Sequence, residues 1–291
     1  MIINPRTQAA RRRAQRAVNR QQAILERDFS RRVRAALDGQ RRAAAQAALT
    51  GDDPIAAASV WDAELGKVLN EGYKRVAASF LELASDALES AKASPGPPEA
   101  KGIMAVAFWA AFGEFARQLV AKKVVNISDV TRAAIRAIVE LGRAEGMSTF
   151  EIAKEIWGAT GRDVNRRRAT RIARTEVHGV SSFATEAAIR AARLPGMTRE
   201  WIAMADERTR SSHRAVHGQL RGMDEAFDLP LSGSEDEMEE LMFPGDPAGS
   251  AGNVINCRCV LIYHTRGSAA ARATARDRER RQYIGMREAW A

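Results

Sequence analysis

The sequence predicts a mainly α-helical protein with a small α+β domain toward its C-terminus. Between residues 5 and 192, apolar side chains recur at the three- and four-residue spacing of helices. After Pro195 this spacing stops, glycine and proline become frequent, and residues 198–204 and 254–263 read as strands. We therefore expect an N-terminal arm and helical bundle, joined by a long helix to the small domain.

The first predicted helix covers residues 5–48, where alanine and arginine dominate and almost nothing breaks a helix. Gly51 to Pro54 interrupt it, and Pro54 suits the first turn of the next helix, predicted over residues 55–93. A linker of sequence Ser-Pro-Gly-Pro-Pro is predicted near residues 94–98.

Four further helices are predicted after this linker. Ser148 followed three residues later by Glu151 has the form of a capping box, which marks the start of a short helix. Ser128 and Asp129 are expected to cap the helix before it. The predicted ranges are 99–125, 128–141, 148–157 and 163–192.

These breaks divide the chain into four expected parts. An acidic insert at residues 224–240 carries eight acids and no base, and we expect an exposed loop there that can hold a short helix at 234–242. The expected parts are a basic helical arm (1–50), a helical region (51–194), a small α+β domain (195–265) and a basic C-terminal tail (266–291).

The excess positive charge lies in the first 50 residues. They hold 12 arginines, no lysine and three acids, which accounts for the whole net charge of +9. Arginine pairs bidentately with phosphate and carboxylate, so we expect a contact with DNA or an acidic protein surface. The alternative is a solvated helix face. The arginines expected to make this contact are Arg11, Arg12, Arg13, Arg16, Arg20, Arg31, Arg32, Arg34, Arg41 and Arg42.

No membrane span or secretory signal is expected. The most apolar run, residues 103–120, is interrupted by Glu114 and Arg117, which favours a buried or amphipathic helix. No apolar run follows the basic residues at the start of the sequence. Cys257 and Cys259 are poorly spaced for a structural disulfide, which fits a reducing compartment.

Two histidines and two cysteines are the strongest candidates for chemistry. His213 and His217 would share one face of a helix, and Cys257 and Cys259 would share one face of a strand. Together they could form a tetrahedral zinc site, although the Cys-x-Cys spacing is tighter than usual. Alternatively, the cysteines are small buried apolar residues, or one is a nucleophile with His213 as its base. The sequence has no Walker A, dinucleotide-binding or HExxH motif, so ATPase, dehydrogenase and zincin functions lack support.

Residues 165–265 contain a series of rare and turn-forming residues that we expect to brace the small domain. They are Trp201, Asp206, Arg208, Arg210, His213, Gly218, Phe243, Pro244, Gly245, Asp246, Asn256 and Arg258, with Cys257 and Cys259. The order and spacing of these residues resemble the phage Mu F-like family of minor head proteins.

The resemblance implies a virion component of a tailed phage, made in the bacterial cytoplasm. It would lie inside the head near the portal vertex, in multiple copies around the portal, and aid assembly, DNA packaging or ejection. Its implied partners are the portal protein, the major capsid or scaffolding protein and packaged DNA, with no membrane. No cofactor is required for this role, and a bound zinc remains open.

Two other functions are left open by the sequence. A Cys/His or zinc-dependent hydrolase, or a toxin-like enzyme delivered with the virion, would use the histidines and cysteines for catalysis. A free nucleic-acid-binding protein would use the arginine-rich segment without a protein partner, and its binding would fall with salt.

Overall fold

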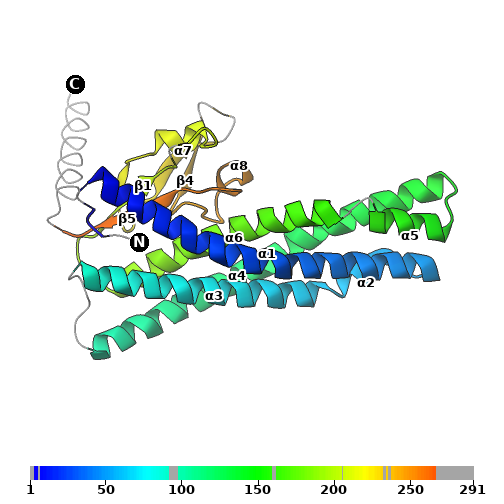
Figure 1. The fold of residues 1–291 in the computed structure, drawn as a ribbon, viewed down its shortest axis with the longest axis horizontal. Coiled ribbons are helices and arrows are strands. Elements are labelled where there is room, and N and C mark those ends of the chain that lie inside the picture. The colour runs from blue at the N-terminus through cyan, green and yellow to red at the C-terminus, as the bar shows by residue number, and fades with distance from the viewer. Residues whose placement is uncertain are drawn as a thin grey trace, which may run out of the picture. The chain divides into compact units, whose positions relative to one another are not determined.

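The computed structural model describes residues 3–266 except 6, 92–97, 159–161, 205, 232–233 and 235–236. It confirms the predicted fold class, since most of the described residues are helical and the strands lie after residue 195 (Figure 1). The helices are α1 (Gln8–Thr50), α2 (Pro54–Ser59), α3 (Asp62–Ser90), α4 (Pro98–Ala144), α5 (Thr149–Gly158), α6 (Arg162–Ala191), α7 (Ser211–Ala215) and α8 (Ala251–Val254). The strands are β1 (Thr198–Ile202), β2 (Leu220–Gly222), β3 (Phe227–Pro230), β4 (Met238–Leu241) and β5 (Val260–His264).

The described residues form two compact units, each assembled from separate parts of the chain. We call them the sheet unit, within Met1–Gln22, Ala77–Phe112 and His178–Ala291, and the helical unit, within Ala23–Val76 and Gly113–Val177. Helices α1, α3, α4 and α6 therefore each contribute residues to both units. The four sequence-continuous parts expected above remain a prediction. Residues 94–97 of the expected linker and residues 267–291 of the expected tail lie outside the described residues.

In the helical unit, the predicted apolar spacing of the helices becomes a packed core. Leu69 and Val33 are fully buried, and the Phe29 ring contacts the Tyr73 ring edge-on with centroids 6.1 Å apart. Glycine is required at position 72, because a Cβ there would lie 2.5 Å from the Phe29 ring. A second cluster consists of Ala44, Ala45, Ala48, Ala58, Ile135, Ile152, Ala153 and Ile156.

The starts of two helices in this unit agree with their expected caps. Pro54 begins α2, and the Asp53 carboxylate accepts the Ile55 N–H at 2.8 Å. Before α5, the backbone N–H of Ser148 donates to the Glu151 carboxylate at 2.8 Å, and the Glu151 N–H donates to the Ser148 hydroxyl oxygen at 3.3 Å. The predicted capping box is confirmed.

The break expected between residues 125 and 128 is wrong, because α4 continues through it. Ser128 is buried and does not cap a helix: its hydroxyl donates to Asp62 at 2.6 Å and accepts from the Gln40 amide at 3.0 Å. Arg132, one turn later, pairs with the same Asp62 at 2.7 Å. These contacts satisfy the hydrogen-bonding groups of Ser128 and Arg132. The helix continues because it contains no proline or glycine at this point.

The sheet unit contains a three-stranded antiparallel sheet with the order β2-β1-β5. Central strand β1 is buried along its whole length, and Glu200 faces Leu220 on one side and Ile262 on the other. Trp201 packs with Phe227 and Val216 in the core on one side of this sheet.

The acidic insert forms a β-hairpin, so the loop and short helix expected there are wrong. Strands β3 and β4 pair antiparallel, with Phe227 opposite Leu241 and Asp228 opposite Glu240. Phe227, Leu229 and Leu241 are fully buried, whereas Asp228 and Glu240 are exposed. In β3, the buried Phe227 and Leu229 alternate with the exposed Asp228, which is the two-residue period of a strand. Burial of these apolar side chains stabilises the hairpin.

One of the described helices is long and apolar enough to cross a membrane by length and composition, namely Gly102–Ala144 within α4. A single such helix is a weak indication, because core helices of soluble proteins meet the same test. Within it, Phe108 and Phe112 are buried, while Val106 and Trp109 are exposed.

Candidate functional site

His213, Cys257 and Cys259 form a buried cluster in the sheet unit. The His213 Nδ1 lies 3.2 Å from the Cys259 sulfur and 3.7 Å from the Cys257 sulfur. One ligand atom from each of the three residues lies within 4.8 Å of the others, and each residue is at most 2% exposed. The Trp201 and His213 rings are nearly perpendicular, with centroids 6.0 Å apart. This arrangement could hold a soft metal ion or a thiolate–imidazole pair.

Local backbone structure brings the cluster together. His213 lies on the short helix α7, and Cys259 immediately precedes β5. Directly before Cys257, Asn256 has a φ of 58°, a left-handed conformation that asparagine tolerates better than most residues. The chain can therefore turn after α8 and present two cysteines to one imidazole.

Polar contacts hold the segments that carry the cluster. The Asp206 carboxylate accepts two hydrogen bonds from the Arg258 guanidinium, at 2.5 and 2.8 Å, and so forms a bidentate pair with Arg258. Arg210 donates to the Ile255 carbonyl oxygen at 2.5 Å, and the Arg208 side chain is exposed. The Arg258 contact lowers the pKa of Asp206 to about 2.

The pKa values of the two thiols are shifted in opposite directions. Hydrogen bonds from Cys257 and His213 lower the pKa of Cys259 well below its ordinary value, against the effect of burial. Burial and the neighbouring Cys259 raise the pKa of Cys257. Cys259 is therefore the more acidic thiol of the pair, with Cys257 and His213 as its hydrogen-bond partners.

His217 does not join the cluster, so the expected set of four ligands is not assembled. It is exposed, and its Nδ1 accepts the Ala203 N–H at 3.1 Å. With Met204, Asp206 and Arg214 it lines an open pocket on the surface of the sheet unit. Its separation from His213 follows from the end of α7 at Ala215, which stops the two histidines from sharing a helix face.

The Phe243–Pro247 segment forms a turn that packs against α6. Asp246 accepts the Met242 N–H at 2.9 Å and the Ala248 N–H at 3.0 Å. Gly245 has a φ of 80°, and a Cβ there would lie 2.7 Å from the His178 ring. Gly218, with a φ of 81°, makes the other tight turn of the bracing set, and its N–H donates to the Trp201 carbonyl oxygen at 2.7 Å.

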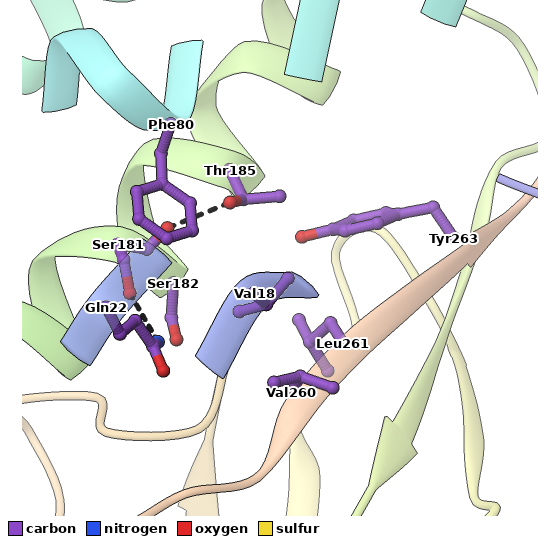
Figure 2. A pocket seen from close by; sticks show the side chains of 9 residues that line it. All are labelled: Val18, Gln22, Phe80, Ser181, Ser182, Thr185, Val260, Leu261 and Tyr263. Atoms are coloured by element: carbon purple, nitrogen blue, oxygen red, sulfur yellow. Dashed lines mark hydrogen bonds between the residues drawn. The ribbon is translucent and has the colours of Figure 1, made fainter. Parts of the chain in front are cut away.

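His178, on α6, is a buried histidine of the sheet unit that the sequence did not single out. Its Nδ1 lies 3.2 Å from the Gln22 amide nitrogen, and burial together with the charge of His213 lowers its pKa to about 3. Gln22 also donates to Ser181 at 2.8 Å, beside a cavity of about 20 Å³ that Val260 lines from β5 (Figure 2). A cavity of that volume has room for about one water molecule.

The arginines of α1 divide into paired and unpaired groups. Arg11 pairs with Glu200 at 2.5 Å, Arg31 and Arg32 pair with Asp28, Arg34 pairs with Asp38, and Arg41 is buried. The predicted contact residues that are exposed and have no ion pair within the described part of the chain are Arg12, Arg13, Arg16, Arg20 and Arg42.

Four of these unpaired arginines lie close together on α1. Arg12, Arg16 and Arg20 follow one another at four-residue spacing, and Arg13 lies beside them. They belong to the sheet unit, whereas Arg42 belongs to the helical unit. Eight residues of helix span about 12 Å, so this group, which we call the α1 arginine face, presents four positive charges in a short stretch.

A buried charge network in the sheet unit was missed by sequence reasoning. The Arg199 side chain is fully buried and donates to Glu186 at 3.1 Å, to the Met242 carbonyl at 2.6 Å and to the Gly222 carbonyl at 3.0 Å. Tyr263 also donates to Glu186, at 3.0 Å. The available signal was an arginine two residues from Trp201 in a strand, which places both on one face.

The cluster and the turn fall within a segment that matches a known family. Residues 120–262 match the family described as Phage Mu protein F like protein, which confirms the resemblance found in the motifs. The chain is 30% identical over 130 residues to the minor head protein GP7 of Bacillus phage SPP1, covering 44% of this chain and 39% of that protein. It is 31% identical over 123 residues to the NAD(+)–arginine ADP-ribosyltransferase EFV of Enterococcus faecalis, covering 42% of this chain and 23% of that protein. The matched segment thus spans less than half of either relative, and no solved structure matches significantly.

Proposed function

We propose that this chain is a minor head protein of a tailed phage, because residues 120–262 match the family described as Phage Mu protein F like protein. The observation that carries the proposal is the 30% identity to the minor head protein GP7 of phage SPP1. In this proposal the chain acts by binding and not by catalysis. It lies inside the head near the portal vertex, in multiple copies, after synthesis in the host cytoplasm, and it aids assembly, DNA packaging or ejection.

The α1 arginine face supplies the proposed contact with a polyanionic partner. Its four guanidinium groups are exposed and have no acidic partner among the described residues, so they can pair with phosphate or carboxylate at little desolvation cost. Packaged DNA and an acidic surface of the portal, major capsid or scaffolding protein are the proposed partners. The paired arginines of α1 do not contribute, because their charges are already neutralised.

Substitution of the arginine face tests this proposal better than deletion of residues 1–50. Helix α1 supplies buried residues such as Phe29 and Leu37, so its deletion would unfold the chain. We expect the quadruple glutamine variant of the face to fold normally and to be lost from purified heads, as measured by quantitative immunoblotting. The matched control removes four exposed basic side chains of the helical unit that were not predicted to contact a partner, Arg27, Lys122, Arg136 and Arg143.

DNA binding separates the proposed partners. If DNA is the partner, the slope of log K against log salt for duplex DNA becomes shallower by about 3 to 4 in the quadruple variant, since each lost phosphate contact removes about 0.9. If a head protein is the partner, incorporation falls while the salt slope is unchanged. Normal incorporation of the variant would contradict the arginine contact, and absence of the wild-type chain from heads would contradict the head function.

The second candidate function is a Cys/His enzyme, favoured by the lowered pKa of Cys259 and by its sulfur lying 3.2 Å from the His213 Nδ1. Its weakness is access, because both thiols are at most 2% exposed. A catalytic role predicts that Cys259→Ser leaves incorporation into heads normal and abolishes an activity. Under the proposed binding function, Cys259→Ser changes stability and incorporation together.

A further inference from the structure

We propose that His213, Cys257 and Cys259 bind one zinc ion through the imidazole Nδ1 and the two sulfur atoms, with one coordination position left for a water molecule. The proposal rests on the positions of these atoms in the sheet unit and does not depend on the proposed head function. The sequence suggested four ligands, and the proposal keeps three of them. His217 is left out because it is exposed and its Nδ1 accepts the Ala203 N–H.

The distances between the three atoms suit a zinc coordination sphere. Zinc–sulfur bonds of about 2.3 Å and zinc–nitrogen bonds of about 2.05 Å at tetrahedral angles place nitrogen and sulfur about 3.5 Å apart. The observed separations of Nδ1 from the two sulfurs are 3.2 and 3.7 Å, on either side of this value. A small rotation of the side chains would therefore be enough to centre an ion among them.

The chemistry of the donor atoms also favours zinc, a metal ion of borderline softness. Two thiolates and an imidazole are the ligands that zinc prefers, whereas magnesium and calcium require oxygen. Zinc binds cysteine as the thiolate, so loading of the site would release the thiol protons to solvent, and the cation would neutralise the two buried thiolates.

The surroundings favour a structural site over a catalytic one. The three ligands are at most 2% exposed, and Trp201, Val216 and Phe227 pack in the same buried cluster as the cysteines. A substrate therefore has no direct path to the metal. The ion would instead tie His213 on α7 to the segment before β5, two elements that are 44 to 46 residues apart in the sequence.

The test measures zinc in the full-length chain. The protein is expressed in zinc-supplemented medium, purified without chelator and analysed by inductively coupled plasma mass spectrometry. We expect roughly one zinc per chain, in keeping with a single three-ligand site. The Cys257→Ser and Cys259→Ser variants should lose it, and His217→Ala, the matched control, should retain it. A wild-type chain without zinc above the buffer level, or a Cys257→Ser, Cys259→Ser double variant with full zinc content, would overturn the proposal.

A second measurement keeps the proposal testable if the serine variants do not fold. Wild-type protein is stripped with chelator and reloaded with cobalt(II), a spectroscopic substitute for zinc. We expect thiolate-to-cobalt charge-transfer absorption and the visible bands of a four-coordinate ion, together with protection of both thiols from a thiol reagent. Absence of these bands, or equal thiol reactivity with and without metal, contradicts the assignment. Loss of zinc in His217→Ala would overturn the choice of three ligands.

Discussion

In the sheet unit, the fully buried arginine Arg199 bonds a carboxylate and three backbone carbonyl oxygens, whereas in the helical unit Arg132 makes its two ion pairs where water still reaches it. The Arg132 side chain is 21% exposed and its partner Asp129 is 61% exposed. Arginine thus occupies a core position in the sheet unit and a partly exposed position on a helix surface in the helical unit. The short strands of the sheet unit depend on specific polar contacts, while the long helices depend on burial of periodic apolar faces.

The largest expected effect is that of Arg199→Ala. We expect a loss of about 3–5 kcal/mol in the free energy of unfolding, because the substitution leaves Glu186 buried without its principal cation. Chemical denaturation followed by circular dichroism measures the loss, and hydrogen exchange with mass spectrometry locates it in the sheet unit. The paired control, Arg132→Ala, should cost about 1 kcal/mol or less. Equal losses in the two variants would remove the contrast between the units.

The next effect concerns the helical unit. Leu69 is fully buried on α3, so Leu69→Ala should cost about 3 kcal/mol, within the range of about 2–5 kcal/mol for such truncations. Hydrogen exchange should rise first in peptides of the helical unit. Val60→Ala, at a position that is 77% exposed, is the control and should change stability by less than about 0.5 kcal/mol. A small effect at Leu69 would show that apolar burial does not dominate in this unit.

A smaller effect is the loss of folding stability at acidic pH. It should arise in the sheet unit, because all four histidines lie there. His178 has a pKa of about 3 in the folded chain and an ordinary value of 6.5, so the unfolded chain binds more protons between these values. Stability from this group is therefore present above pH 6.5 and is lost as the pH falls. Lowering the pH from 6.5 to 4.5 should cost about 2 kcal/mol through His178 alone.

The contribution of His178 is obtained as a difference between two chains. Denaturation curves of the wild type and of His178→Gln are recorded from pH 7 down to about pH 4.5, so that titration of other groups cancels to a first approximation. The variant should show a shallower loss of stability with acid. Parallel pH profiles would show that His178 does not remain neutral in the folded chain.

The smallest effect is expected at the exposed start of α5. Ser148→Ala removes the hydroxyl that accepts the Glu151 N–H, and should cost about 1 kcal/mol. The loss should appear as faster hydrogen exchange in the first turn of α5. Thr170→Ala serves as a control, because its hydroxyl donates to a carbonyl within α6 and caps no helix. A negligible change at Ser148 would show that packing of Ile152 and Ile156 alone holds α5 in place.

The sequence predicted the helices better than the contacts of the site, and the reason is physical. Helix signals are local, so Pro54 and the Ser148–Glu151 capping box identified two helix starts. The false break at Ser128 arose because a serine looks like a cap until its tertiary partners are known. The acidic residues of 224–240 concealed a hairpin, since only three of its apolar side chains enter the core.

The site residues show the same limit. Cys257, Cys259 and His213 were singled out because rare residues were crowded in one segment, and the structure places them together. The grouping of His217 with them assumed a helix longer than α7. Arg258 as the partner of Asp206 lies 52 positions away in the sequence, and no local pattern identifies such a pair.

The assembly of both compact units from alternating segments has a consequence for inheritance. A genetic exchange at any single point between codons 23 and 177 would join parts of each unit to parts from a different ancestor. The co-adapted contacts of both units would then be mixed at once, for example the Gln22–Ser181 and Tyr73–Glu176 hydrogen bonds. Recombination among related genomes should therefore transfer this interval whole, because a crossover outside it divides only the sheet unit.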